Sequence, residues 1–241
     1  MELSVVVPVH NENENLRALI EEIELALKGE EGAHEIIYVD DGSTDDTLAR
    51  LIALKKDFSV LRVLHHKRCC GQSTALRTGI LAAHGRVIAT LDGDGQNDPA
   101  NIPAMLEAWR ELNAGWASGA MVAGYRKKRK DTGWRKLSSR IANNIRAGLL
   151  RDETPDTGCG LKVFGRELFM AFPYFDHMHR FLPALAQRAG GKVVSVEVNH
   201  RPRTQGQSKY GTLGRLWVGI WDLIGVMWLQ RRAHVAEIEE R

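Results

Sequence analysis

A strand-like run followed by helical spacing recurs along the first half of the chain, and this alternation constrains the fold most. Residues 3–9, LSVVVPV, form the kind of continuous β-branched run that is buried on both faces of a sheet. Apolar residues then recur at helical spacing, at Leu16, Leu19, Ile20, Ile23 and Leu27. Further strands are predicted, with helices between them, at 35–41, 60–64, 86–92 and 120–124. This order predicts an α/β fold with a mostly parallel sheet and helices on both faces.

The helices between the strands have their own signals. Ser43 is expected to cap a helix whose inner face carries Leu48, Leu51 and Ile52. Another helix is predicted from about Gln72 to Ala83. After residue 126 the alternation weakens into a basic helix, a loop rich in Gly and Cys, a strand at 192–198 and an apolar tail. We expect this second half to form an appended lobe.

Basic residues are concentrated in one stretch, although the net charge of the whole chain is only +3. Residues 125–151 contain one acid, Asp131, among many Arg and Lys. Such a local charge favours a phosphate group, a nucleic acid or an acidic lipid surface. Apolar residues repeat every four positions within it, at Leu137, Ile141, Ile145 and Leu149. The pattern is typical of a membrane-surface helix or of a solvated helix packed on the sheet.

Two observations favour the membrane surface over nucleic acid. No recognisable nucleic-acid module accompanies the charge, so we expect no nucleic-acid partner. Tryptophan favours the headgroup region of a bilayer, and the chain carries Trp134, Trp217, Trp221 and Trp228. The apolar segment 213–229 is short for a spanning helix and contains Arg215 and Asp222. It is therefore expected to be interfacial or re-entrant.

The cysteines and the N-terminal sequence indicate a reducing compartment. The chain has an odd number of cysteines, Cys69, Cys70 and Cys159, and the first two are adjacent. A disulfide framework is not expected from this number and spacing. The first residues become polar within ten positions and lack a basic leader, so no secretory signal is expected.

The stretch LDGDGQNDP, residues 91–99, follows the fourth predicted strand and carries the first candidate site. Asp92, Asp94 and Gln96 supply oxygen atoms at alternating positions, and Gly93 and Gly95 allow the backbone to approach closely. Hard divalent cations bind such oxygen ligands and share them with substrate phosphates. The same letters are also typical of a solvated turn. The motif alone leaves these two readings about even.

Two more strand ends carry polar residues. Asp41, in VDDGSTDDT, is placed to accept hydrogen bonds from a base or a ribose hydroxyl. Asp45 and Asp46 are also explained as first-turn charges of a helix. Pro8 lacks a ladder donor and is expected to turn the chain outward, so that His10 and Glu12 project towards a ligand. Glu12 is equally explained as a carboxylate at the start of a helix.

Taken together, these motifs resemble the family 2 glycosyltransferases with the GT-A fold. The order and spacing of SVVVPVHNENENL, YVDDGSTDDT, CCGQSTALRTGI and ATLDGDGQNDP match that family. Within it, the chain looks like the polyprenyl-phosphate glycosyltransferases, the branch that includes dolichol-phosphate mannose synthase. The resemblance continues through AGYRKKR, DTGCGLKVFGRE, HRFLPALAQRAGG and VNHRPRTQGQSKYG, and so covers nearly the whole chain.

The resemblance implies roles for the matched positions. The nucleotide-sugar donor, of UDP or GDP type, would be held by Pro8, His10, Glu12, Asp41 and Gly71. Mg²⁺ or Mn²⁺ on the sugar diphosphate would be held by Asp92, Asp94 and Gln96. Phosphate groups of donor or acceptor would meet Arg126, Arg203, Ser208 and Lys209, since Arg offers a planar fork and Lys a compact charge. Catalysis would depend on Asp94, Arg126, Arg203 and Lys209. His177, His179 and His200 lack ligand spacing and are assigned no metal.

The implied reaction is an inverting transfer of a sugar to a polyprenyl phosphate of the undecaprenyl or dolichyl type. An ionised phosphate monoester needs no general base, so none is named, although Asp98 and Asp156 are candidates to steer a substrate hydroxyl. The enzyme would attach to the cytoplasmic face of the membrane, peripherally or monotopically, and the sequence is compatible with a homo-oligomer. One alternative is transfer to a hydroxyl of a polysaccharide or protein, which usually needs a carboxylate base. The other is a non-catalytic nucleotide-sugar-binding protein.

Three parts are expected along the chain. Residues 1–126 would form the nucleotide-sugar-binding GT-A core, and 127–211 the acceptor-binding, sheet-completing part of the same domain. Residues 212–241 would form an apolar or amphipathic membrane-associated tail, shorter than the multiple spanning helices of several relatives. Relatives commonly have an alanine-like residue in place of Gly93 and a bulkier apolar one in place of Gly95. This departure predicts a more mobile loop.

Overall fold

The structure is a computed structural model. It describes residues 1–115, 119–126, 146, 148–150, 152, 154–201 and 212–234, with side chains in the last segment described from residue 218 onward.

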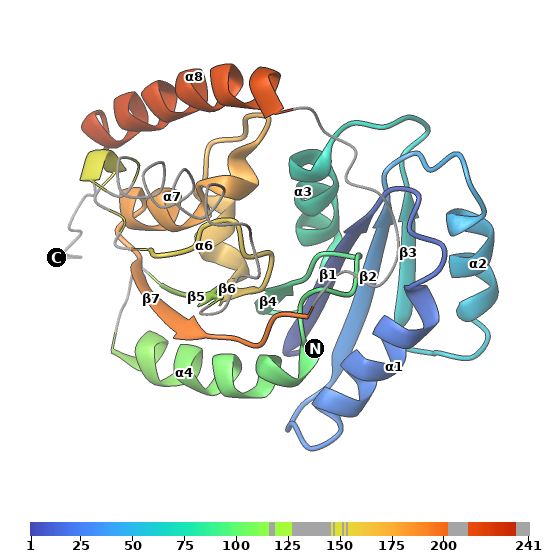
Figure 1. Cartoon of the computed structure of the whole chain (residues 1–241). Helices are drawn as coiled ribbons and strands as arrows, with labels where there is room; N and C mark the ends of the chain where they lie inside the picture. The colour runs from blue at the N-terminus through green and yellow to red at the C-terminus, as the bar shows by residue number, and fades with distance from the viewer. Residues whose placement is uncertain are drawn as a thin grey trace, which may run out of the picture.

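The described residues form one mixed, mostly parallel sheet (Figure 1). Its strands are β1 (Leu3–Val9), β2 (His34–Asp40), β3 (Leu61–His65), β4 (Val87–Thr90), β5 (Ala120–Tyr125), β6 (Lys162–Gly165) and β7 (Lys192–Glu197). Their spatial order is β3-β2-β1-β4-β6-β5-β7. The predicted α/β class and all six predicted strands are confirmed, with no strand end shifted by more than two residues.

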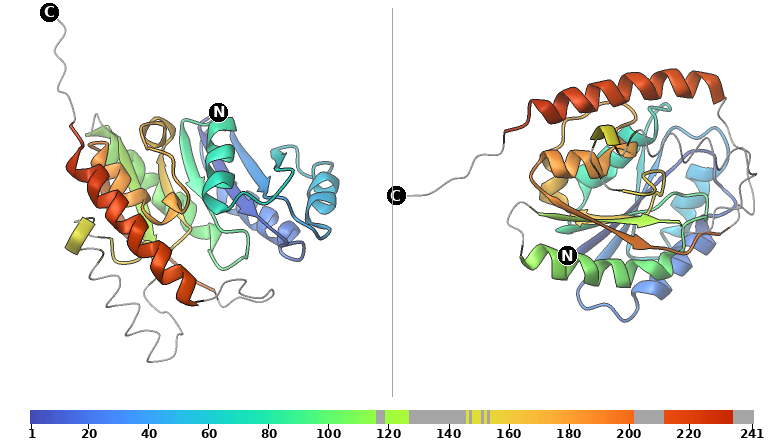
Figure 2. Two further views of the ribbon diagram at one scale, coloured as in Figure 1. Left: turned by 90° about the horizontal axis from the view of Figure 1, so that it is seen from above. Right: turned by 60° about the vertical axis from the view of Figure 1, so that its left-hand side comes forward.

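Helices cover both faces of the sheet, as predicted (Figure 2). One face packs against α1 (Leu16–Leu27), α2 (Thr47–Leu54) and α4 (Ile102–Ala114), which follows a short helical turn η1 (Pro99–Asn101). The other face packs against α3 (Gln72–Ala82), α6 (Arg166–Met170) and α7 (Leu182–Arg188), with η2 (Met178–Arg180) before α7. The last helix, α8 (Thr212–Arg231), lies against α7 on the outside of this layer.

Strand β6 corrects the expected organisation of the second half. It lies between β4 and β5 and runs antiparallel to both, pairing Ala89 with Val163 and Val122 with Val163. The second half is therefore not an appended lobe, because it supplies a strand at the centre of the sheet, in line with the sheet-completing part expected over 127–211. The strand is only four residues long, within LKVFG, and its Lys162 is an unexpected side chain for a buried strand.

Three local predictions near the first strands are wrong. Helix α2 begins at Thr47 after Asp46, and the Ser43 hydroxyl accepts a hydrogen bond from the Asn11 amide instead of capping the helix. Ile52 is exposed and Leu54 is buried in its place. Pro8 does not turn the chain outward, because β1 continues to Val9. The pairing of β1 with β4 ends at Val6. Pro8, which has no backbone N–H, therefore leaves no hydrogen bond between β1 and β4 unmade.

The tail and the basic stretch are only partly described. Within the described part of the chain, no helix has the length and apolar character needed to cross a bilayer. Of the predicted amphipathic stripe, Leu149 is described and its side chain is exposed. Arg146, in the same stretch, is buried against Asp152 and donates to the Thr154 carbonyl at 2.7 Å.

Candidate active site

The loops after β1 and β2 are joined to each other by hydrogen bonds. His10 Nδ1 donates to the Asp41 carbonyl at 2.8 Å, and the Glu12 amide donates to Thr47 Oγ1 at 3.0 Å. Asn11, with a φ of 55°, accepts from the Thr44 amide through its side-chain oxygen at 2.7 Å. The predicted nucleotide-binding residues His10 and Glu12 are therefore brought beside Asp41, at the carboxyl edge of the sheet where ligands bind in open α/β folds. Pro8 is buried within β1.

Asp41 organises the third loop at this edge. Its Oδ1 accepts from His66 Nδ1 at 2.7 Å and from the Cys70 amide at 2.8 Å. Its Oδ2 accepts from the Gly71 amide at 2.8 Å and from Cys69 Sγ at 3.3 Å. Burial pushes the pKa of Asp41 upward, but these hydrogen bonds outweigh it and hold the pKa below its usual value. The carboxylate therefore stays ionised and holds residues 66–71 in place.

The Asp92–Asp98 loop follows β4 and lies beside the start of α3. Gln72 Nε2 donates to Asp92 Oδ1 at 2.8 Å, and the Asp92 amide donates to the side chain of buried Asn97 at 3.1 Å. Asp94 Oδ1 accepts from the Gln96 amide at 3.1 Å. Gln96 reaches Arg201, whose amide donates to the Gln96 carbonyl at 3.0 Å. The three predicted metal ligands thus lie in one ordered turn.

The two glycines of this loop have different structural reasons. A Cβ on Gly93 would lie 2.3 Å from Val9 Cγ1, so only glycine lets the loop pack on the end of β1. Gly95 has open space around it, but its φ of 71° is in the region that favours glycine. We expected both glycines to make the loop more mobile. At position 93, the close packing against Val9 is instead the reason that a glycine is needed.

The electrostatics of the loop fit a divalent cation. Burial, together with the neighbouring charge of Asp94, raises the pKa of Asp92 to about 6, although Lys162 and Arg126 oppose this shift. Each carboxylate uses Oδ1 for a hydrogen bond with the described part of the chain. Two neighbouring carboxylates that repel each other form the oxygen donor set that hard cations prefer. The residues therefore fit Mg²⁺ or Mn²⁺.

A pH-dependent effect on stability follows from the raised pKa of Asp92. The folded pKa of about 6 exceeds the ordinary value of 3.8, so the stability contributed by this group is lost as the pH rises through about 6. We expect metal-free Asp92→Asn to unfold at higher denaturant concentration than the wild type at pH 8, with a smaller difference at pH 4.

Urea titrations of both chains at the two pH values measure this difference. Asp98→Asn is the matched control. It should lower stability, because Asp98 Oδ1 pairs with Arg201 at 2.7 Å. A pH-independent difference for Asp92→Asn would contradict the assignment.

Arg126, at the end of β5, is paired with Asp156. Its Nε lies 2.5 Å from Asp156 Oδ2 and its Nη2 lies 2.9 Å from Oδ1, a bidentate arrangement. Both side chains are largely buried. Burial opposes the guanidinium charge, but Asp156 more than compensates and raises the pKa of Arg126. Asp156 therefore presents the Arg126 cation close to Asp92.

Lys162 on β6 was not predicted from the sequence. Its Nζ is buried and donates to the carbonyls of Cys159 and Thr157. Burial lowers the pKa of Lys162, and the nearby thiol of Cys159 and carboxylates of Asp92 and Asp156 counteract part of this effect. Lys162 thus orders the loop that carries Asp156 and adds a positive charge beneath the carboxylates.

Three further residues near Asp92 were not predicted from the sequence, and three predicted residues lie outside the part of the chain that the structure describes. Gln72, Asn97 and Gly160 contact or flank Asp92. Gln72, Gly160 and Lys162 occur within the quoted motifs CCGQSTALRTGI and DTGCGLKVFGRE. The motifs therefore contained these residues, but the sequence did not indicate that they lie near Asp92. Arg203, Ser208 and Lys209 lie outside the described residues. Gly71 is placed beside Asp41, as stated above.

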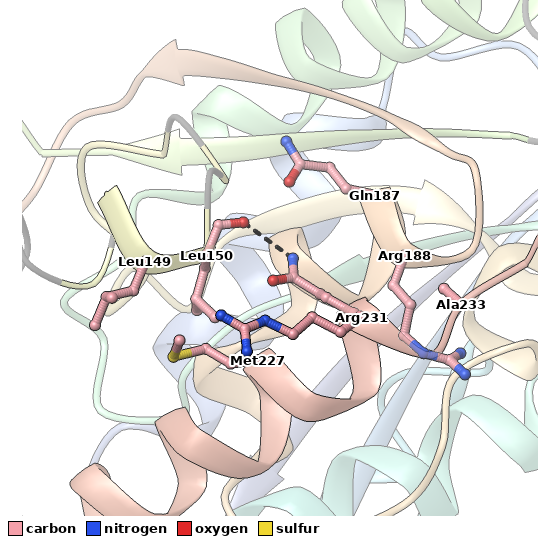
Figure 3. A pocket seen from close by; sticks show the side chains of 8 residues that line it. Leu149, Leu150, Gln187, Arg188, Met227, Arg231 and Ala233 are labelled. Atoms are coloured by element: carbon pink, nitrogen blue, oxygen red, sulfur yellow. Dashed lines mark hydrogen bonds between the residues drawn. The ribbon is translucent and has the colours of Figure 1, made fainter.

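A separate cavity of about 560 Å³ lies between α7, the end of α8 and residues 148–150 (Figure 3). Leu149, Leu150 and Met227 give it apolar walls, while Arg188 and Arg231 add guanidinium groups. Gln230 Nε2 closes one side by donating to the Leu150 carbonyl at 3.0 Å. None of its lining residues belongs to the Asp92 site.

Comparison with known proteins agrees with this geometry. The model of glycosyl transferase family 2 matches residues 4–172, and the chain belongs to this family of glycosyltransferases. It is 36% identical over 237 residues to a dodecaprenyl-phosphate galacturonate synthase of Rhizobium johnstonii, covering 96% of this chain and 68% of that protein. It is 34% identical over 225 residues to an undecaprenyl-phosphate 4-deoxy-4-formamido-L-arabinose transferase of Yersinia pestis, covering 92% and 66%. The chain thus spans about two thirds of the length of these relatives.

A solved structure shares the fold. Glucosyl-3-phosphoglycerate synthase of Mycobacterium tuberculosis, in complex with Mn²⁺, UDP-glucose and glycerol 3-phosphate, superposes with a TM-score of 0.65 at 22% identity, covering 95% of this chain and 79% of that one. Its complex with UDP gives a TM-score of 0.66 at 18% identity, covering 98% and 82%. The GT-A-like arrangement predicted from the motifs is therefore confirmed.

Proposed function

We propose that this chain transfers a sugar from a nucleotide-diphosphate sugar to a polyprenyl phosphate, with inversion at the anomeric carbon. The observation that carries the proposal is the pair Asp92 and Asp94 at the carboxyl end of β4, next to the Arg126 cation. Two relatives at 34–36% identity are named a dodecaprenyl-phosphate galacturonate synthase and an undecaprenyl-phosphate 4-deoxy-4-formamido-L-arabinose transferase. The phosphate groups of donor and acceptor are both negatively charged and need a positive charge beside them. Arg126 supplies one such charge, and a cation bound by Asp92 and Asp94 would supply another.

The residues divide the work between the two substrates. His10, Glu12 and the Asp41-ordered loop would contact the nucleotide. Asp92 and Asp94, with Gln96, would hold Mg²⁺ or Mn²⁺, which when bound neutralises charge on the departing diphosphate. Arg126, held in position by Asp156, would face the phosphate oxygens, and Arg203, Ser208 and Lys209 would complete the phosphate contacts. Catalysis is then positioning plus charge stabilisation.

The ion pairing of Asp98 and Asp156 bears on the class of acceptor. Transfer to a hydroxyl usually needs a carboxylate base, whereas a phosphate monoester with a second pKa of about 6 is already ionised near neutrality. Asp156 is bound to Arg126 and Asp98 to Arg201, so both candidates are ion-paired. This favours the lipid-phosphate acceptor over the hydroxyl acceptor.

The test is a panel of nucleotide sugars offered with undecaprenyl phosphate or with a hydroxyl acceptor, in Mg²⁺ and in Mn²⁺. Mass spectrometry is expected to detect a glycosyl phospholipid in the lipid-phosphate arm alone. Product on the hydroxyl acceptor alone would establish the alternative activity. Nucleotide-sugar binding without product in either arm would favour the non-catalytic role.

We further propose that α8 places the site at the cytoplasmic membrane surface. Its exposed apolar side chains follow helical spacing, at Val218, Trp221, Ile224 and Trp228. Asp222 turns to the protein side and pairs with His177 at 3.3 Å, so its charge does not interrupt the exposed apolar face. Arg188 and Arg231 lie near the end of the same helix and suit anionic headgroups. The attachment is peripheral or monotopic.

Replacing Trp221 and Trp228 together with Ala should weaken binding to anionic vesicles at least about tenfold, since burying a large apolar side chain contributes ~1.5–3 kcal/mol. Flotation with vesicles containing phosphatidylglycerol measures the effect. Leu25→Ala is the matched control, because Leu25 is an exposed apolar residue on α1. Equal flotation of the double variant and the control would contradict an interfacial role for α8.

A further inference from the structure

A second cluster of metal-ligating side chains lies outside the Asp92 loop. Ligand atoms of Asp41, His66 and Cys70 all lie within 4.8 Å of one another. Cys69 Sγ stands beside this set, 3.3 Å from Asp41 Oδ2. This group combines oxygen, nitrogen and sulfur donors, whereas the Asp92 loop offers oxygen alone.

We propose that Asp41, His66 and Cys70 form a binding site for a soft or borderline divalent cation, with Zn²⁺ the best match. Thiolate and imidazole ligands select such ions, while Mg²⁺ and Mn²⁺ prefer oxygen. Zinc takes these ligands at roughly 2.0–2.3 Å, so two ligands of one tetrahedral ion lie about 3.3–3.8 Å apart. The observed cluster closes to that spacing with small side-chain shifts.

The hydrogen bonds of His66 prepare this geometry. Nδ1 lies 2.7 Å from Asp41 Oδ1 and shares a proton with it, in the place that the cation takes. Nε2 lies 2.9 Å from Thr78 Oγ1. When Nδ1 binds the metal, the ring proton moves to Nε2 and is donated to Thr78, the outer contact that metal-binding histidines usually make.

The accessibility of the ligands allows an ion to enter. Asp41 is buried and fixed by the amides of Cys70 and Gly71, so the carboxylate is already oriented. Cys70 and Cys69 are both exposed. Binding releases the thiol proton of Cys70, because the metal takes the thiolate. The cluster shares Asp41 with the proposed nucleotide contacts, but a soft cation goes beyond the proposed function, since no step of sugar transfer needs one.

Cobalt titration of the full chain in a thiol-free reductant tests the proposal. One equivalent of Co²⁺ should produce thiolate-to-cobalt charge-transfer absorption, and one equivalent of Zn²⁺ should remove it. Cys70→Ser and His66→Gln should abolish the band, and Thr78→Val should weaken binding about tenfold. Excess Mg²⁺ should not displace the cobalt.

A matched control distinguishes the cluster from a general effect of histidine. His65→Gln removes the neighbouring histidine, whose Nδ1 bonds Asp40 at 2.7 Å, and should leave the band unchanged. Asp94→Asn should also leave it unchanged, so a failure of the transferase assignment does not affect this readout. Absence of the band in the folded wild type, or its survival in Cys70→Ser, would overturn the proposal. Circular dichroism confirms that each variant is folded.

Discussion

Replacing Asp94 with Asn is expected to reduce sugar transfer to a polyprenyl phosphate about 10³-fold. A bound cation supplies several kcal/mol of charge stabilisation, and about 4 kcal/mol corresponds to about 10³ in rate. Asparagine keeps a side-chain oxygen for the hydrogen bond from the Gln96 amide, so the turn should persist. The loss should therefore appear in turnover and in metal dependence, measured by initial rates at varied Mn²⁺. The unfolding midpoint of the metal-free variant should be no lower than that of the wild type, because the repulsion between Asp92 and Asp94 is removed.

The matched variant is Asp57→Asn, on the surface beside Arg17 and far from β4 in the fold. It removes the same charge from the protein and should retain wild-type activity. Full activity of Asp94→Asn would contradict the assignment of Asp94 as a metal ligand. An equal loss of activity in Asp57→Asn would contradict it as well.

Gly160→Ala is expected to reduce activity about 100-fold without removing any functional group. A Cβ at this position would lie 2.2 Å from Asp92 Oδ2 and 2.4 Å from its carboxyl carbon, so the carboxylate must move. Displacements of about 1 Å at a reacting site commonly cost about 10²-fold in rate. Weaker Mn²⁺ binding, measured by calorimetry, should accompany the loss.

Gly158→Ala provides the comparison within the same loop. A Cβ there would lie 3.3 Å from Arg126 Nη2 and 3.5 Å from Asp156 Oδ1, contacts that the long Arg126 side chain can relieve. Its loss of activity should be much smaller than that of Gly160→Ala. If the two variants behave alike, the position of the Asp92 carboxylate does not limit the reaction.

Local pattern explains why much of the fold was predictable. The helices over residues 16–27 and 102–114 carry one apolar face each, and the strands over 3–9 and 34–40 are β-branched runs. Parallel strands place their carboxyl ends at one edge, so the motifs after them were expected to lie together. The hydrogen bonds between the loops of His10 and Asp41 confirm this expectation.

The misses are interactions between distant parts of the chain. β6 is short and contains a lysine, so it has no strong strand pattern, and its place between β4 and β5 depends on pairing partners far away in sequence. The pairing of Arg126 with Asp156 joins residues 30 positions apart, and no periodicity predicts it. Ser43 has the chemistry of a helix cap, but the Asn11 amide from another loop competes for its hydroxyl.

The sequence by itself determined the βα alternation, the family and the positions of the acidic motifs, because these depend on residues close together along the chain. Only the tertiary structure decided that Gly160 faces the Asp92 carboxylate, that Asp156 holds Arg126, and that Lys162 lies buried beneath them. Those three facts follow from β6 entering the middle of the sheet. Its position is set by burial and backbone pairing across more than 70 residues of intervening chain.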